Sequence, residues 1–126
     1  MNVLDSSGWL EYFADGPNAA NFTTPLTELD RLLVPSITLY EVYKSMLRQR
    51  GKQMAVEAIA AMKRGRVLPL DEPLALKAAA TSLELKLPMA DSIIYATARK
   101  HDALLWTQDV DFQGLSGVRY YPKPVG

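Results

Sequence analysis

The sequence predicts an α/β domain in which helices flank a mostly parallel sheet. Short β-type runs such as Asn2–Leu4 and Leu32–Pro35 alternate with longer segments of helical periodicity, an order typical of right-handed βαβ units. The 126 residues, of which 48% are hydrophobic, suit one compact domain with its own core. We therefore expect a single domain over residues 1–126.

The elements of the first third follow from apolar spacing and its interruptions. The strand Asn2–Leu4 ends at Asp5, and a helical pattern then continues as far as Gly16. Residues 18–31 show a broken helical pattern, and Leu32–Pro35 is typical of a second short strand. A carboxylate thus follows the first predicted strand directly.

A helical hairpin is predicted next, with helices over 38–50 and 53–64 separated by a glycine. A third strand is expected over 67–70, and Asp71 is a suitable cap for the helix after it. The remaining pattern predicts a helix over 91–100 and strands over 103–107 and 118–121.

Composition excludes several classes of function. Fourteen Lys and Arg residues balance 14 Asp and Glu residues, so no overall charge attracts nucleic acid or membranes. Cysteine is absent and His101 is the lone histidine, which excludes disulfides, thiolate zinc sites, a cysteine nucleophile and multi-histidine metal sites. With no signal peptide or apolar run of about 20 residues, we expect a cytoplasmic protein without membrane association.

Four carboxylates follow predicted strands or occupy first helical turns: Asp5, Glu41, Asp91 and Asp109. Each has a purely structural alternative. Asp5 can cap a helix, Glu41 can form a capping box with Thr38, Asp91 can favour a helix N-terminus, and Asp109 can form an Asx-turn.

If the fold brings these four carboxylates together, a functional interpretation is favoured over the structural alternatives. If the first and fourth strands are neighbours, Asp5 and Asp109 share one crevice, and Glu41 and Asp91 face it from helices. Clustered carboxylates repel one another and stay ionised chiefly when divalent cations neutralise them. Oxygen ligands alone suit Mg²⁺ or Mn²⁺. Such ions can activate water for phosphodiester hydrolysis.

Four sequence blocks carry a resemblance to a known family. In order they are Val3-Leu4-Asp5-Ser6-Ser7, Pro35-Ser36-Ile37-Thr38-Leu39-Tyr40-Glu41, Leu87-Pro88-Met89-Ala90-Asp91-Ser92-Ile93-Ile94-Tyr95-Ala96-Thr97-Ala98 and Thr107-Gln108-Asp109-Val110-Asp111-Phe112. Over nearly the whole chain, their order and spacing resemble the PIN-domain ribonucleases, most of all the VapC toxins of type II toxin-antitoxin (VapBC) pairs.

This resemblance implies a PIN-like α/β/α sandwich, an acidic pocket that binds Mg²⁺ or Mn²⁺, and endonucleolytic cleavage of RNA. It also implies a homodimer held by a cognate antitoxin. Carried over by position, Asp5, Glu41, Asp91 and Asp109 match the family's acidic residues, with Asp5, Asp91 and Asp109 as metal ligands. Asp111 is the alternative to Asp109 for the fourth acidic position of the family.

Supporting roles are expected for the hydroxyl groups of Ser6 and Thr107, which can bond a carboxylate or a bound water. The alternative is that both satisfy nearby backbone groups. His101 lies near the end of a predicted helix, where a positive charge interacts favourably with the helix dipole, so we expect a structural role for it. The sequence then offers no separate general base, and we expect the metal to activate water and a carboxylate to accept the proton.

The predicted helical hairpin carries the candidate RNA and partner surfaces. Residues 44–66 hold seven of the 14 basic residues against a single Glu57, which indicates either an RNA-recruiting patch or a solvated helical face. The patch residues are Lys44, Arg48, Arg50 and Lys52. Apolar residues of the same hairpin belong either to the core or to a groove for a partner helix: Met46, Leu47, Met54, Ile59 and Met62.

Two rival functions remain open. A phosphotransfer domain would use an Asp after a strand with Mg²⁺ nearby, but it normally needs a basic residue late in the fold. A non-catalytic binding module with a PIN-like fold would not need all four acidic positions, which are filled here.

Overall fold

Five short parallel strands form one sheet in the order β3-β2-β1-β4-β5 in the computed structural model, which describes residues 1–124. This confirms the predicted α/β class. The strands are β1 (Asn2–Leu4), β2 (Leu32–Pro35), β3 (Arg66–Leu68), β4 (Leu104–Thr107) and β5 (Val118–Tyr120).

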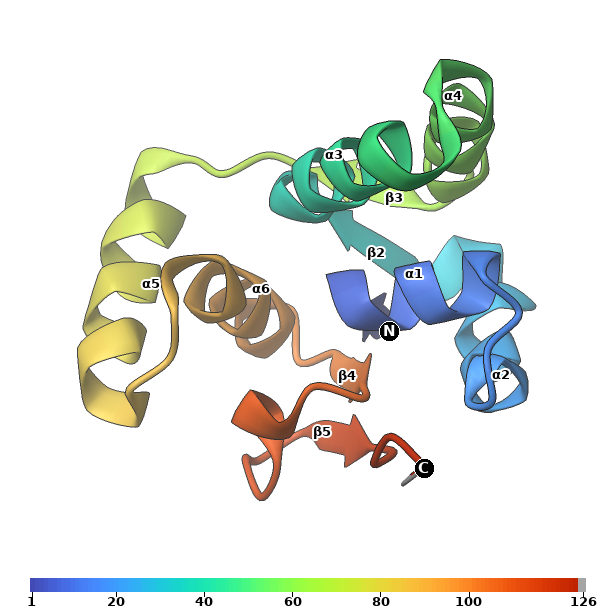
Figure 1. Cartoon of the computed structure of the whole chain (residues 1–126). Coiled ribbons are helices and arrows are strands. Elements are labelled where there is room, and N and C mark those ends of the chain that lie inside the picture. The colour runs from blue at the N-terminus through green and yellow to red at the C-terminus, as the bar shows by residue number, and fades with distance from the viewer. Residues whose placement is uncertain (125–126) are drawn as a thin grey trace.

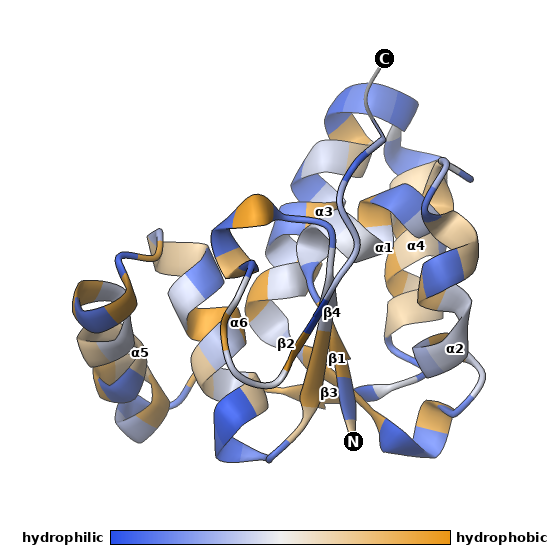
Figure 2. Cartoon of the chain, turned by 90° about the horizontal axis from the view of Figure 1, so that it is seen from below, coloured by the Kyte–Doolittle hydropathy of each residue, from blue (hydrophilic) through white to orange (hydrophobic). Residues whose placement is uncertain are grey.

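Helices cover both faces of this sheet (Figure 1). They are α1 (Ser6–Phe13), α2 (Thr23–Leu26), α3 (Ser36–Arg50), α4 (Lys52–Met62), α5 (Glu72–Leu85) and α6 (Met89–Lys100), with short 3-10 turns η1 (Ala19–Phe22), η2 (Leu29–Arg31) and η3 (Val110–Phe112). Figure 2 shows the apolar strands between two groups of helices, with α5 and α6 on one side and α1 and α4 on the other. No helix of residues 1–124 is long and apolar enough to cross a membrane.

The strands divide their side chains between two cores because successive residues of a strand point to opposite faces. Leu4 packs with Trp106 and residues of α1, α3 and α4 in one core. Val3 packs with Leu105 and residues of α6 in the other. Val3 and Leu4 are both fully buried, so each contributes roughly 1.5–3 kcal/mol of burial free energy.

β1 lies at the centre of the sheet, between β2 and β4. Val3 pairs in register with both Leu33 and Leu105, so the carboxyl ends of the three strands meet at one edge. The predicted adjacency of the first and fourth strands is thereby confirmed. The residues after β1 and β4 come together at this edge, as expected for a ligand site in an open parallel sheet.

The capping-box interpretation of Thr38 and Glu41 is wrong. α3 begins at Ser36, two residues before the predicted start, so Thr38 lies inside the first turn. Its hydroxyl donates to the carbonyl of Pro35 over 2.7 Å instead of capping a backbone N–H. Glu41 is left without this structural role.

Smaller differences concern element ends. The third strand is Arg66–Leu68 instead of 67–70, and α4 begins at Lys52 and ends at Met62. The cap at Asp71 is confirmed, because its carboxylate accepts from the Leu74 N–H over 3.0 Å.

Candidate active site

Asp5 follows β1 directly and caps α1. Its Oδ1 accepts from the Gly8 N–H at 2.8 Å, and its Oδ2 accepts from the Thr107 hydroxyl at 2.7 Å. The Ser7 hydroxyl lies 2.8 and 2.9 Å from the two oxygens. A Cβ at position 8 would collide with the Leu4 side chain, so a larger residue there would require Leu4 to shift. The structural and functional interpretations of Asp5 therefore coincide: the cap holds the carboxylate at the sheet edge.

Burial makes the charge on Asp5 unfavourable. The side chain is only 2% exposed, and desolvation raises the pKa of its carboxyl from 3.8 to about 6. Hydrogen bonds from Thr107, Gly8 and Ser7 oppose this rise, and the nearby charge of Asp109 adds to it.

Asp91, Asp109 and Asp111 form a tight acidic cluster beside Asp5. Each offers an oxygen within 4.8 Å of the others. Burial raises the pKa of Asp91 to about 8, and the charge of Asp109, a hydrogen bond with Asp111 and the charge of Asp5 contribute to this rise. The structure thus brings together Asp5, Asp91 and Asp109, as expected, and places Asp111 with them.

Thr107 connects the two parts of the site. While its hydroxyl donates to Asp5, the same oxygen accepts from the Asp109 N–H at 2.9 Å. Asp109 in turn forms the Asx-turn considered from the sequence, since its Oδ1 accepts from the Asp111 N–H at 2.9 Å. The expected bond between Thr107 and a carboxylate is therefore present.

Glu41 lies at the margin of the site. From α3 its Oε1 accepts from the Ser6 hydroxyl over 2.6 Å, so Ser6 bonds a carboxylate as expected. Because Ser6 directly follows Asp5, this bond ties α3 to the same sheet edge. The described charge interactions of the acidic cluster join Asp5, Asp91, Asp109 and Asp111 and do not include Glu41.

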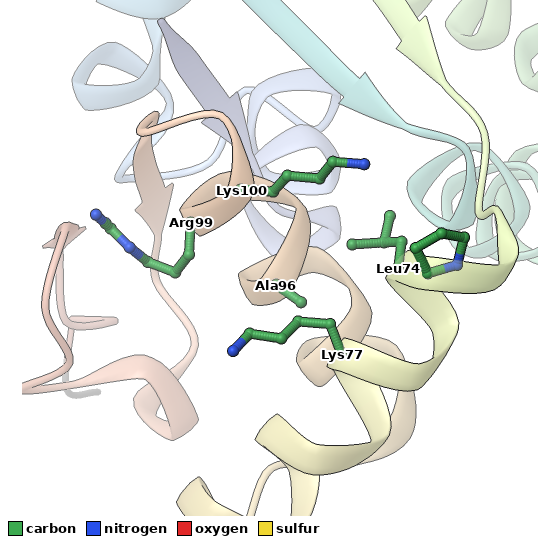
Figure 3. A pocket seen from close by; sticks show the side chains of 6 residues that line it. Leu74, Lys77, Ala96, Arg99 and Lys100 are labelled. Atoms are coloured by element: carbon green, nitrogen blue, oxygen red, sulfur yellow. The ribbon is translucent and has the colours of Figure 1, made fainter.

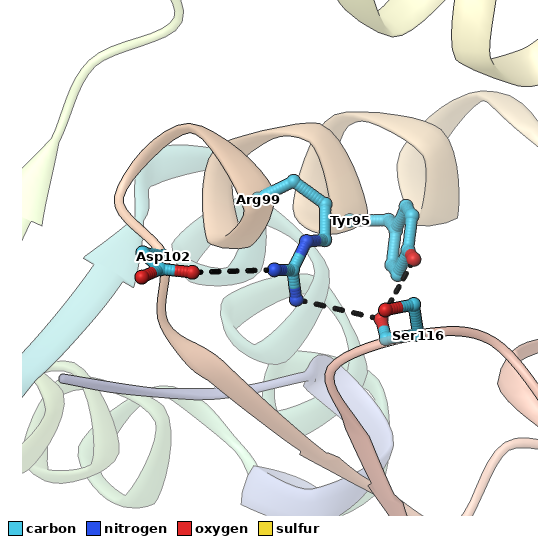
Figure 4. A network of polar contacts seen from close by, with 4 residues as sticks. All are labelled: Tyr95, Arg99, Asp102 and Ser116. Atoms are coloured by element: carbon cyan, nitrogen blue, oxygen red, sulfur yellow. Dashed lines mark hydrogen bonds and ion pairs between the residues drawn. The ribbon is translucent and has the colours of Figure 1, made fainter.

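Two supporting contacts were not anticipated from the sequence. Ser7, in addition to Ser6, donates a hydrogen bond to a carboxylate of the site. Its position two residues after a capping Asp is the sequence feature that could have predicted this bond. A second network fixes the loop before β5 (Figure 4): the Tyr95 hydroxyl donates to the Ser116 carbonyl at 2.7 Å, and Arg99 reaches the same carbonyl at 3.4 Å. No local pattern reveals this contact, because the partners are 21 and 17 residues apart.

The predicted RNA-patch residues Lys44, Arg48, Arg50 and Lys52 are all exposed on α3 and α4. The apolar residues of the same hairpin fall into a buried and an exposed group. Met46 and Met62 belong to the core, whereas Leu47 and Met54 are each 40% exposed.

A separate cleft of about 360 Å³ lies between α5 and α6, away from the acidic cluster (Figure 3). Its walls include Leu74, Ala96 and the stems of Lys77, Arg99 and Lys100. None of its lining residues is a carboxylate, so this cleft is no candidate for the metal-dependent chemistry.

The acidic cluster suits a hard divalent cation. Its donors are carboxylate oxygens alone, the ligand type of Mg²⁺ and Mn²⁺. Burial and the charges of neighbouring carboxylates both disfavour the ionised form of Asp91, and a divalent cation would offset the repulsion among these groups. The residues present therefore fit such an ion.

The sequence profile of the PIN domain family matches residues 3–118. The chain belongs to the PIN-domain family. The resemblance noted in the sequence is confirmed, and the sheet with its flanking helices is the PIN fold. No curated protein sequence matches the chain.

Solved structures with this PIN fold include parts of toxin-antitoxin systems. A chain of the toxin-antitoxin complex from Klebsiella pneumoniae is 23% identical, with a TM-score of 0.82 over 98% of this chain and 100% of that one. VapC20 of Mycobacterium tuberculosis, a toxin that cleaves the sarcin-ricin loop, is 20% identical, with a TM-score of 0.80 over 97% and 100%. A chain of VapBC2 from Rickettsia felis, bound to promoter DNA, is 14% identical, with a TM-score of 0.74 over 96% and 97%.

Proposed function

We propose that this PIN domain is a metal-dependent endoribonuclease and the toxin of a type II toxin-antitoxin pair. The observation that carries the proposal is the acidic cluster at the carboxyl edge of the sheet, where Asp91, Asp109 and Asp111 offer oxygens within 4.8 Å of one another and Asp5 adds its charge. Likeness in fold to VapC20, a toxin that cleaves the sarcin-ricin loop, supports the choice of RNA as substrate.

Asp5, Asp91 and Asp109 are the metal ligands that the family resemblance implies, and Asp111 adds an oxygen to the same cluster, so these carboxylates would hold Mg²⁺ or Mn²⁺. Such an ion lowers the pKa of a coordinated water and stabilises the leaving oxygen of a phosphodiester. Thr107 orients Asp5 and the Asp109 backbone together. His101 caps the C-terminus of α6, at the opposite end of the helix from Asp91, so a carboxylate of the cluster is the proton acceptor that this site offers.

A phosphotransfer reaction at Asp5 is less well supported. A phosphoacceptor must expose a free carboxylate oxygen to the phosphate, but Asp5 is 2% exposed and both of its oxygens accept hydrogen bonds. The geometry favours a supporting carboxylate over a nucleophile.

The α3–α4 hairpin supports the partner part of the proposal. Met54 lines a small cleft with Phe13, Met46 and Ala58, and an apolar face of a partner helix is the kind of segment that such a cleft receives. We propose that the cognate antitoxin binds here and that the toxin is a homodimer. The exposed basic residues of the hairpin would recruit RNA by attracting its phosphates.

The decisive experiment is cleavage of total cellular RNA by purified wild type and Asp91→Asn, each with Mg²⁺, Mn²⁺ or EDTA, followed by mapping of the new RNA ends. We expect discrete ends that need metal and are lost in Asp91→Asn. Asp30→Asn, at an exposed position, is the matched control and should cleave like wild type. Absence of cleavage by a folded, metal-binding wild type would favour a non-catalytic binding module.

A further inference from the structure

A cleft of about 250 Å³ opens beside the acidic cluster. It is lined by Gln108, Asp109, Val110, Tyr120, Pro122 and Lys123. Asp109 belongs to both the cleft and the cluster, so a ligand in the cleft lies next to the proposed site of hydrolysis. The volume is below the usual range for drug-sized ligands, so the cleft suits a group no larger than a single base.

Gln108 is held in one orientation by Asn18. The Asn18 amide nitrogen donates to the Pro122 carbonyl and to the Gln108 Oε1, both at 3.1 Å. A backbone carbonyl can only accept, so the nitrogen of Asn18 must face Pro122. Its second N–H then requires an acceptor, which fixes the oxygen of Gln108 toward Asn18.

The amide nitrogen of Gln108 is consequently free. Gln108 is 7% exposed, yet its Nε2 has no acceptor among residues 1–124 and is not one of the fully buried atoms left without a partner. Its N–H groups therefore reach solvent from an otherwise buried side chain. Because Asn18 holds the amide, these donors keep a fixed direction and are available to water or to a ligand that enters the cleft.

The other walls of the cleft match the parts of a nucleotide. Tyr120 pairs in register with Thr107 and lines the cleft, and bases stack on aromatic rings of this kind. Lys123 is exposed and carries the charge that a phosphate requires. Gln108 adds the donors that distinguish one base edge from another.

We propose that this cleft binds a base of the RNA next to the cleaved phosphodiester and selects bases with a keto group, uracil or guanine. Uracil O4 and guanine O6 accept hydrogen bonds, whereas cytosine N4 and adenine N6 donate them. The N–H donors of Gln108 match the oxygens O4 of uracil and O6 of guanine, and they oppose the amino groups at N4 of cytosine and N6 of adenine. The inference rests on the proposed nuclease function and adds a base preference to it.

The test measures binding of two fluorescent 2′-O-methyl RNA octamers, U8 and C8, by anisotropy in EDTA, so that no cleavage occurs. These probes share the pyrimidine ring and differ at one base edge, where O4 and N3–H of uracil replace the N4 amino group and the N3 acceptor of cytosine. We expect wild type to prefer U8 by about three- to tenfold, the effect of one hydrogen bond gained or opposed. Gln108→Met should remove the preference, and Gln108→Glu, which keeps an oxygen for Asn18 and replaces the donor with an acceptor, should reverse it.

Gln113→Met is the matched control, because Gln113 is exposed and does not line the cleft; it should keep the wild-type ratio. Lys123→Ala should weaken both octamers equally. Equal affinity of wild type for U8 and C8, or no measurable binding, overturns the inference.

Cleavage-site mapping separates this inference from the proposed function. A wild type that cleaves RNA with a base pattern unchanged by Gln108→Met overturns the base-selecting cleft alone. A wild type that prefers U8 but cleaves no RNA overturns the nuclease proposal and leaves the cleft standing.

Discussion

Replacing Asp5 with asparagine should stabilise the metal-free protein at pH 8 while abolishing cleavage. Burial raises the pKa of Asp5 from 3.8 to about 6, a difference of about 2 pH units, so the ionised side chain costs about 3 kcal/mol at pH 8. Asn keeps an oxygen for the Gly8 N–H and carries no charge, which removes this cost. Its amide N–H groups can donate to the Thr107 and Ser7 hydroxyl oxygens, which donate to Oδ2 in wild type.

The sign follows from proton binding. Because the pKa of Asp5 is higher in the folded state, the folded protein binds more protons than the unfolded chain between about pH 4 and pH 7. The free energy of unfolding of wild type therefore falls as pH rises through this range. The raised pKa of Asp91, about 8, extends the fall to higher pH.

The assay is thermal unfolding in EDTA at pH 4 and pH 8. With 126 residues, about 3 kcal/mol corresponds to a gain in Tm of up to about 10 °C for Asp5→Asn at pH 8. The gain should vanish near pH 4, where wild-type Asp5 is protonated, and Asp30→Asn should show none at either pH. Added Mn²⁺ should raise the Tm of wild type far more than that of Asp5→Asn, because the ion neutralises the cluster. A lower Tm for Asp5→Asn than for wild type at pH 8 in EDTA would refute the reasoning.

Three further outcomes are expected. Thr107→Val removes a buried hydrogen bond to Asp5 and should cost about 1–3 kcal/mol of stability at pH 8; an unchanged Tm would show that the bond is dispensable. Tyr95→Phe, which loses the bond that holds the loop before β5, should cost about 1 kcal/mol in urea unfolding, and unchanged stability would show that the loop does not need this bond. Charge reversal at Arg48 and Arg50 should weaken RNA binding and flatten its salt dependence, whereas affinity equal to wild type at low salt would exclude the patch from RNA recruitment.

Local patterns were sufficient to predict most elements of this chain. β1 and β2 match the predicted strands, and the Asp71 cap is present because the side chain reaches its own helix within three residues. The ends of the helices and strands were predicted less well. α3 starts at Ser36 because Pro35 closes β2 and the helix follows it without a linker, and no capping pattern marks that start.

The carboxylates of the candidate site could be named from the sequence, but their individual contacts could not. Asp5, Asp91 and Asp109 could be named from their places after strands and at a helix start, because those places meet at one sheet edge in any such fold. Whether Asp111 joins them depends on the Asx-turn at Asp109, which turns the next residues toward Asp91. Such a contact needs the tertiary structure.

By itself, the sequence determined the α/β class, because helical and strand periods are local properties of the chain. The order and spacing of four motif blocks carried the resemblance to the PIN-domain family, and the carboxylates after strands and at helix starts were the candidate site residues. Only the tertiary structure decided that Thr107 joins Asp5 to Asp109, 102 residues from the first of them. It also decided that Asn18 orients Gln108 across 90 residues. The physical reason is that burial and hydrogen bonding between distant segments arise only when the sheet brings those segments together, and these set the charge and the free donors of the site.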